Sequence, residues 1–172
     1  MAEAKGREWW KIAIVAVIAF ELLGAVSGWV SNSGYGNDWF AGLIKPTFMP
    51  PGWAFGVVWP VLYAMLGVAL AMVLAQPPSQ ARRIGLILFG AQMVLNFSWS
   101  PLFFAAHDIS LAKWVIFLMA ALAAAAARQF LKVRRDAGLL MIPYLGWLVF
   151  AATLNAAIEA LNPQAGRSLL GI

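Results

Sequence analysis

Long apolar segments separated by short polar connections run through the whole chain. Five of them approach or exceed the roughly 20 residues that an α-helix needs to cross the hydrocarbon of a bilayer. They cover residues 12–30, 55–75, 84–106, 111–130 and 139–161. In the fourth segment Lys113 and Arg128 lie near the ends, where long basic side chains can reach the headgroups. The pattern predicts an all-α integral membrane protein, in which residues 1–172 form one domain built as a five transmembrane helix bundle.

The connections after the first are short, which makes consecutive helices antiparallel neighbours. The first connection, residues 31–54, is much longer. A basic stretch precedes the first apolar segment, as in a secretory signal peptide. However, that segment is longer than a signal-peptide core, carries Glu21 at its centre and lacks a clear small-residue cleavage site. We therefore expect a retained helix.

Composition and charge agree with a membrane protein, since 63% of the residues are hydrophobic and only 11% are charged. The absence of cysteine excludes disulfides, thiol catalysis and cysteine-ligated metals. The net charge of +5 does not indicate a nucleic-acid partner here, because the basic residues follow the topology. Nine of the 12 Lys and Arg residues fall on the side of the N-terminus and of the second and fourth connections. The positive-inside rule places that side in the cytoplasm.

Three apolar segments carry a stripe of aromatic or amide side chains at helical spacing, each beside a proline. The stripes are Phe55, Trp59 and Tyr63 in the second segment, Asn96, Trp99 and Phe103 in the third, and Trp147, Ala151, Leu154 and Asn155 in the fifth. A proline distorts a helix, and in lipid the broken backbone is tolerated where protein or a cavity covers it. The amides need buried partners, which neighbouring helices or a ligand can supply. Composition alone leaves packing and a ligand pocket as equal alternatives.

Smaller features are open to two interpretations each. Gly24 and Gly28 form a GxxxG pair, which suits either packing within the bundle or a dimer face. Glu21, at mid-bilayer, is either a structural hydrogen-bonding group or part of a proton relay. His107, the only histidine, is interpreted as a solvated loop residue rather than a haem ligand, and no metal-ligand cluster is expected.

Three motifs in order resemble the TspO/MBR family, known as translocator protein, tryptophan-rich sensory protein or peripheral-type benzodiazepine receptor. The motifs are W-F-A-G-L-I-K-P-x-F-x-P-P-G-W-x-F-G-x-V-W-x-x-L-Y, N-F-S-W-S-P-L-F-F and P-Y-L-G-W-L-x-F-A-A-T-L-N. The resemblance extends from the first segment to Asn155. It implies a homodimeric five-helix bundle that binds porphyrins such as protoporphyrin IX and haem between its helices, with residues 31–54 as a lid. For this chain it implies a bacterial member in the cell membrane, with no permanently bound cofactor.

Individual residues match family positions. Trp59 and Trp147 match tryptophans implicated in light-dependent porphyrin breakdown, and Asn96, Trp99, Ala151 and Leu154 match pocket-lining positions. Trp53 matches the tryptophan at the end of the lid. Phe55, Tyr63 and Phe103 join this ligand-binding set through their spacing. The family's animal sterol motif has a tyrosine and an arginine where this chain has Ala156 and Ala160, which argues against specific cholesterol binding.

These expectations favour a membrane receptor or sensor that binds porphyrins and regulates tetrapyrrole metabolism or a stress response. The alternatives are an enzyme that degrades protoporphyrin IX in light, with Trp59 and Trp147 as redox partners, and a transporter of porphyrins or other amphipathic ligands. At the cavity edge Lys45 is expected to pair with a porphyrin propionate or to face the headgroups.

The charge distribution generates a topology prediction. A reporter that is active only in the cytoplasm should be inactive when fused after Ile172 and active when inserted in the arginine-rich fourth connection, residues 131–138. Activity of the C-terminal fusion would contradict the assigned orientation.

Overall fold

The computed structural model describes residues 8–166 and contains in that range five helices that are long and apolar enough to span a membrane. The elements are α2 (Trp9–Val30), α3 (Asp38–Gly42), α4 (Gly52–Leu74), α5 (Gln80–Ser100), η1 (Pro101–Ala105), α6 (Ile109–Val133), α7 (Arg135–Leu139) and α8 (Ile142–Leu161). The five spans are α2, α4, α5 with η1, α6, and α7 with α8, so the predicted all-α bundle is confirmed. Lys5, Arg7 and Arg167, which enter the charge count, lie outside the described residues.

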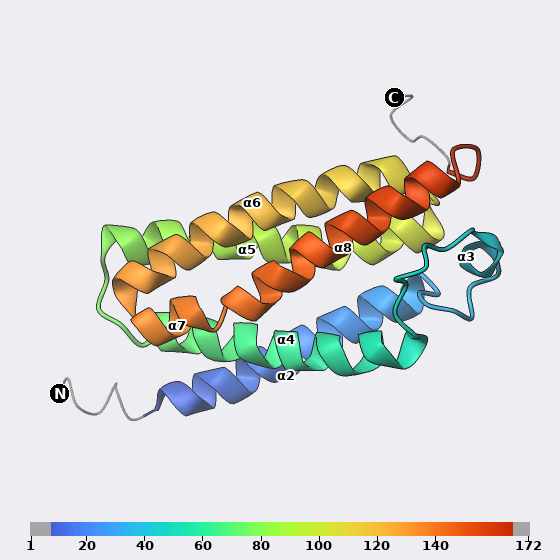
Figure 1. Ribbon diagram of the computed structural model, residues 1–172. Coiled ribbons are helices and arrows are strands. Elements are labelled where there is room, and N and C mark those ends of the chain that lie inside the picture. The colour runs from blue at the N-terminus through green and yellow to red at the C-terminus, as the bar shows by residue number, and fades with distance from the viewer. Residues whose placement is uncertain (1–7, 167–172) are drawn as a thin grey trace.

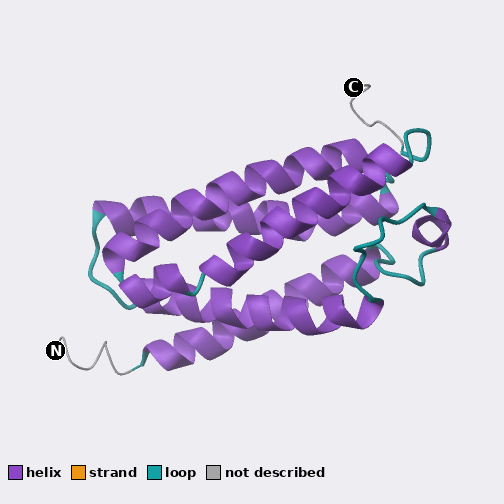
Figure 2. Cartoon of the chain, viewed as in Figure 1, coloured by secondary structure: helices purple, strands orange, loops and turns teal. Residues whose placement is uncertain are grey.

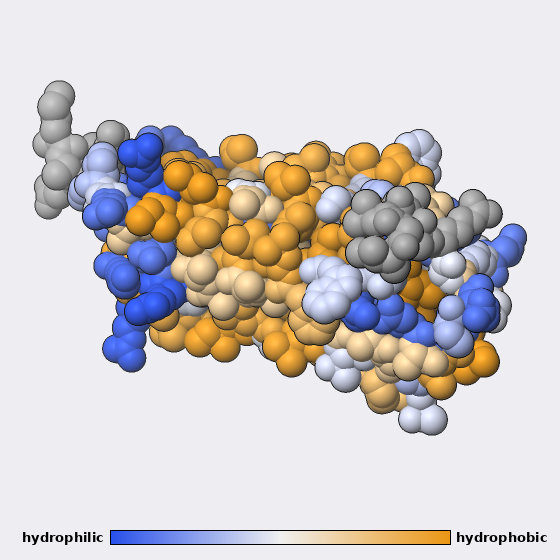
Figure 3. Space-filling view, turned by 90° about the horizontal axis from the view of Figure 1, so that it is seen from above, coloured by the Kyte–Doolittle hydropathy of each residue, from blue (hydrophilic) through white to orange (hydrophobic). Residues whose placement is uncertain are grey.

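The spans lie side by side, and α3 with its flanking connection covers one end of the bundle (Figure 1). We call this end the loop end, and the C-terminal end of α8 lies there too. The regular structure of the described residues is helical, and the longest loops flank α3 (Figure 2). On the face shown in Figure 3, an apolar band separates hydrophilic side chains at the two ends of the molecule. This distribution is what a bilayer requires of a spanning bundle.

Polar side chains fix the starts of three helices. Asn37 accepts a hydrogen bond from the backbone N–H of Phe40 at 2.9 Å, Ser79 caps α5, and Asp108 caps α6. Such caps satisfy the backbone donors that a first helical turn leaves unpaired.

The fourth connection was predicted only as a short link between two spans, and the structure shows more than that. The fourth connection contains α7, and a break at Leu140 and Met141 separates that helix from α8.

The prolines beside the three predicted stripes, Pro60, Pro101 and Pro143, have different effects on their helices. The helix α4 continues past Pro60 without interruption, so the predicted distortion does not end the helix there. At Pro101 the α-helix changes to the π-helix η1, whose last bond joins the N–H of Ala106 to the carbonyl of Pro101 at 2.9 Å. Pro143 lies in the first turn of α8, where a missing N–H costs little.

Glycine allows α2 and α4 to approach closely. A Cβ atom on Gly67 would lie 2.8 Å from the backbone nitrogen of Val17, and one on Gly24 would lie 2.3 Å from the ring of Tyr63. Gly24 of the GxxxG pair therefore packs within the bundle, which was one of the two interpretations of this pair; the other was a dimer face. A Cβ atom on Gly28 would meet only the hydroxyl oxygen of Ser33, a residue of the first connection, at 2.9 Å.

The contact between α2 and α4 generates a stability prediction. Gly67→Ala should lower the stability of the purified protein in detergent by about 1–3 kcal/mol, because the backbone of Val17 blocks the new methyl group. Gly90→Ala is the matched control, since nothing lies within 4 Å of a Cβ atom at that helical position. The control should be neutral or slightly stabilising. Equal unfolding temperatures for the two variants would contradict this account of the packing.

Candidate functional site

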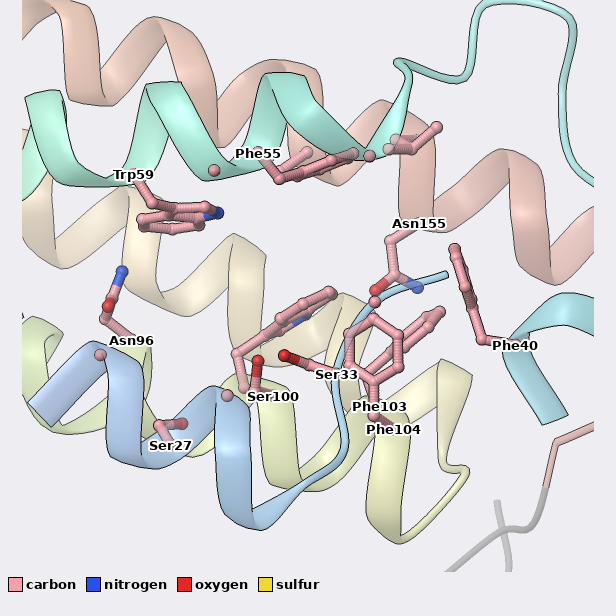
Figure 4. Close-up of a pocket in the computed structure, with 18 of the residues that line it drawn as sticks. Ser27, Ser33, Phe40, Phe55, Trp59, Asn96, Ser100, Phe103, Phe104 and Asn155 are labelled. Atoms are coloured by element: carbon pink, nitrogen blue, oxygen red, sulfur yellow. The ribbon is translucent and has the colours of Figure 1, made fainter. Parts of the chain in front are cut away.

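A cavity of about 760 Å³ lies inside the bundle toward the loop end. This volume is within the range typical of sites for small molecules and cofactors. Residues of every span and of the first connection form its walls. In Figure 4, Phe55 and Trp59 project into it from α4, and Ser27 lies on the opposite side, on α2. Among the described residues that line it, none is a Lys, Arg, His, Asp or Glu.

Nine of the ten predicted ligand-binding residues line this cavity. They are Phe55, Trp59, Tyr63, Asn96, Trp99, Phe103, Trp147, Ala151 and Leu154. Trp53 is not part of the wall, and its side chain is 72% exposed. It lies in the first turn of α4 only two residues before Phe55, so the helical period directs the two side chains to different faces. That these residues bind a ligand stays a prediction.

Two tryptophans from different helices form one aromatic wall. The ring centroids of Trp59 on α4 and Trp147 on α8 lie 6.4 Å apart, with their planes at 84°. Phe55 meets Trp147 edge-on at 5.8 Å, and Tyr63 lies 5.3 Å from Trp59. The two contacts of Trp147 are edge-to-face and the contact between Trp59 and Tyr63 is tilted, and together they hold rigid apolar rings in fixed orientations. The stripes predicted on separate segments are thus parts of one surface.

A chain of hydrogen bonds leads from the cavity wall into the core. The hydroxyl of Tyr63 donates to Oδ1 of Asn96 at 2.7 Å, and Nδ2 of Asn96 donates to the hydroxyl of Tyr144 at 3.0 Å. Tyr144 in turn donates to Oε1 of Gln92 at 2.7 Å. Tyr144 and Gln92 are fully buried. The chain joins α4, α5 and α8, so Asn96 connects helices and lines the cavity at the same time.

The first connection is fastened over the end of the cavity. The side chain of Asn162, just after α8, bonds both backbone groups of Ile44 at 2.8 Å, and the indole of Trp39 donates to the carbonyl of Ala165 at 3.1 Å. Tyr35 donates to the carbonyl of Pro50 at 2.6 Å. Partial burial raises the pKa of Tyr35 above its ordinary value, which is already well above neutral pH, so this hydroxyl is a donor.

Lys45 binds backbone carbonyl groups of the first connection. Its Nζ donates to the backbone carbonyls of Phe40 at 2.7 Å, Leu43 at 3.1 Å and Ala41 at 3.2 Å. It also lies 4.7 Å from the centre of the Phe40 ring. The cation therefore stabilises the C-terminal end of α3, where carbonyl groups lack helical partners. It is already engaged and does not line the cavity.

Neither His107 nor Glu21 lines the cavity. His107 stacks on Trp39 with centroids 4.2 Å apart, and it lies in a loop with a left-handed φ of 59°. Glu21 is half-buried on α2 and takes part in no hydrogen bond or ion pair within residues 8–166, so its predicted structural hydrogen bond is absent from the single chain. In the same range, no cluster of three or more His, Cys, Asp and Glu residues could hold a metal ion.

The sequence interpretation named no wall residue on α2, and it described the first connection only as a lid ending at Trp53. From these parts come Gly24, Ala25, Ser27, Gly28, Trp29, Asn32, Ser33, Gly34, Tyr35, Phe40 and Met49. The small residues of G-A-V-S-G were the available signal, because they leave space rather than fill it. Ala25 and Trp29 on α2 and Gly56 and Pro60 on α4 line the cavity and are also exposed. The cavity therefore reaches the surface between these two helices.

Comparison with known proteins gives one consistent result. The sequence profile of the TspO/MBR family matches residues 13–161. The translocator protein of Sus scrofa is 36% identical over 146 residues, which cover 82% of this chain and 86% of that protein. The tryptophan-rich protein TspO of Chlorobaculum tepidum is 38% identical over 133 residues, covering 73% of this chain and 80% of the relative. Protein CrtK of Rhodobacter capsulatus is 32% identical over 127 residues, covering 73% and 79%.

The hydrogen-bond chain generates a prediction about two tyrosines. Tyr144→Phe should destabilise the protein by about 1–3 kcal/mol, because it leaves groups of both Asn96 and Gln92 buried without a partner. Tyr63→Phe, the matched variant, unpairs only Oδ1 of Asn96, which borders the cavity, and should cost less. The measurement is the unfolding free energy in mixed detergent. Equal losses in the two variants would show that the core end of the chain is not the critical part.

Proposed function

This chain belongs to the TspO/MBR family, and from that premise we propose that it is a membrane receptor that binds porphyrins, such as protoporphyrin IX and haem, in the cavity between its helices. It is a multi-pass membrane protein, and family membership supports a receptor or sensor role. The bound porphyrin would report the state of tetrapyrrole metabolism or of a stress response. We further propose a homodimer in a bacterial cell membrane, with the N-terminus in the cytoplasm.

One observation carries this proposal: the aromatic wall formed by Trp59 and Trp147 inside a mostly apolar cavity whose described lining has no charged side chain. A porphyrin is a flat apolar macrocycle, and rigid aromatic side chains offer it large contact area at low entropic cost. The wall is also formed by the positions that match the family's porphyrin-linked tryptophans. The agreement of geometry with motif favours a porphyrin over an aliphatic lipid.

The porphyrin's two carboxylates need a different environment from its ring. Because the described cavity wall holds no charged side chain and Lys45 is engaged with backbone carbonyls, an ionised propionate has no cationic partner inside. Asn32 and Ser33 of the first connection line the cavity and are exposed. We therefore place the propionates at this polar mouth and the apolar edge of the macrocycle against the two tryptophans.

A light-driven reaction is the second candidate function. Trp59 lies beside both Trp147 and Tyr63, with centroids 6.4 Å and 5.3 Å away, so an indole that gives an electron to a photoexcited porphyrin has two neighbouring aromatic rings. The transfer would leave an indole radical cation and a porphyrin radical anion, and dissolved dioxygen would be the oxidant for the breakdown of the reduced porphyrin that follows.

Phenylalanine substitutions separate binding from photochemistry. If Trp59 and Trp147 only stack on the porphyrin, Trp59→Phe or Trp147→Phe should weaken protoporphyrin IX binding by on the order of 1 kcal/mol. If they act as electron donors, the same variants should lose light-driven breakdown while affinity changes little. The two measurements are fluorescence quenching and the decay of the porphyrin absorption band under light.

The matched control is Trp114→Phe, because Trp114 is 58% exposed on α6 and does not line the cavity. Breakdown at the wild-type rate in the double phenylalanine variant would exclude the enzymatic role. Absence of protoporphyrin IX binding to the unaltered protein would contradict the receptor proposal itself.

A further inference from the structure

Two buried polar atoms in the cavity wall have no hydrogen-bond partner among the described residues. They are the indole nitrogen Nε1 of Trp99 and the amide oxygen Oδ1 of Asn155. A third such atom, Nε2 of Gln92, belongs to a residue that does not line the cavity. Buried donors and acceptors without partners are rare in folded proteins and costly to maintain. At the wall of a cavity, a ligand can supply the missing partners.

The orientation of the Asn155 amide is fixed by its other end. Nδ2 of Asn155 donates to the backbone carbonyl of Ile109 at 2.9 Å, where α6 begins. Exchanging the amide nitrogen and oxygen would bring two acceptors together, so Oδ1 is the atom left for the cavity. The side chain is only 2% exposed, and in Figure 4 it projects from α8 into the interior of the site.

The indole of Trp99 is held equally firmly. It stacks on Phe103 with centroids 5.0 Å apart at 19°, and it meets Phe104 edge-on at 6.0 Å. An indole N–H can only donate a hydrogen bond. The wall therefore presents one fixed acceptor and one fixed donor.

We propose that Asn155 and Trp99 form a neutral polar subsite that selects ligands carrying an uncharged group with both a hydrogen-bond donor and an acceptor, such as a carboxamide or an un-ionised carboxyl group. The donor of this group pairs with Oδ1 of Asn155, and its acceptor pairs with the N–H of Trp99. An ionised carboxylate is rejected, because it offers no donor to Asn155 and finds no cation in the described wall. An ester offers only the acceptor. This proposal rests on the cavity being the ligand site of the proposed receptor.

The test uses three small aromatic probes with the same ring: 2-naphthamide, methyl 2-naphthoate and 2-naphthoate. Binding to the full-length protein in nanodiscs is measured by calorimetry at neutral pH. The amide should bind about tenfold more tightly than the ester, the difference expected when one buried hydrogen bond is lost. The carboxylate should bind most weakly.

Variants assign the preference to the two residues. Asn155→Leu should remove the preference for amide over ester, and Trp99→Phe, which keeps the stacked ring, should weaken amide and ester binding by a similar factor. Thr153→Val is the control, because Thr153 is an exposed residue of α8 whose hydroxyl bonds the carbonyl of Val149. It should leave all three affinities unchanged. If Asn155→Leu fails to fold, the effect of Trp99→Phe on the ester decides the test.

Equal affinities for amide and ester in the unaltered protein, an amide preference that survives Asn155→Leu, or unchanged affinities in Trp99→Phe would overturn the subsite. A protein that binds protoporphyrin IX yet shows no amide preference would refute this inference and leave the receptor proposal standing. A protein that prefers the amide but does not bind protoporphyrin IX would support the subsite and contradict the porphyrin-receptor proposal.

Discussion

The hydrocarbon of the bilayer offers no hydrogen bonds, and this constraint shapes the polar interior of the protein. Backbone groups must pair within helices, and buried side chains must pair with one another. Pro101 has no N–H to donate to the carbonyl of Phe97, and that carbonyl accepts a hydrogen bond from the hydroxyl of Ser27 on α2 instead. Where polar side chains enter the core, the chain from Tyr63 through Asn96 and Tyr144 to Gln92 satisfies all but one of their polar atoms. Most of the polar groups that these departures bring into the bundle are thus paired by neighbouring helices.

The cavity follows from where the helices can approach each other. Gly67 allows α4 to rest on the backbone of Val17, which draws α2 and α4 together in one half of the bundle. Nearer the loop end, the ring of Tyr63 lies against Gly24, and beyond it aromatic side chains of α4 and α8 meet only at their edges. Edge-to-face pairs favour a fixed angle between their rings, so these rings border the space beside them. Close packing at one end and aromatic separation at the other therefore leave a preformed site.

Hydropathy was sufficient to predict the spans, because length and composition alone decide which segments can cross a membrane. The nine lining residues that were predicted lie on helical stripes, where periodicity and motif agree. What escaped prediction depends on tertiary contacts. The role of Lys45 depends on the carbonyl groups of α3 folding back toward it, and the exposure of Trp53 depends on the rotation of the first turn of α4. The wall contributed by α2 was missed because Gly24 and Gly28 have no side chain that could mark a cavity face, and their effect depends on which helix packs against them.

Two asparagines in this bundle show how the same side chain serves structure and recognition. Asn96 has both amide atoms paired with tyrosines from other helices, so its bonding capacity is largely used in holding α4, α5 and α8 together. Asn155 uses its nitrogen to tie α8 to the start of α6 and keeps its oxygen at the cavity. In a medium without water, an unpaired oxygen is tolerable only where something else can complete it. The polarity of this cavity is therefore set by the polar atoms that the helix contacts leave unpaired, and in the proposed subsite these atoms would decide which ligand is preferred.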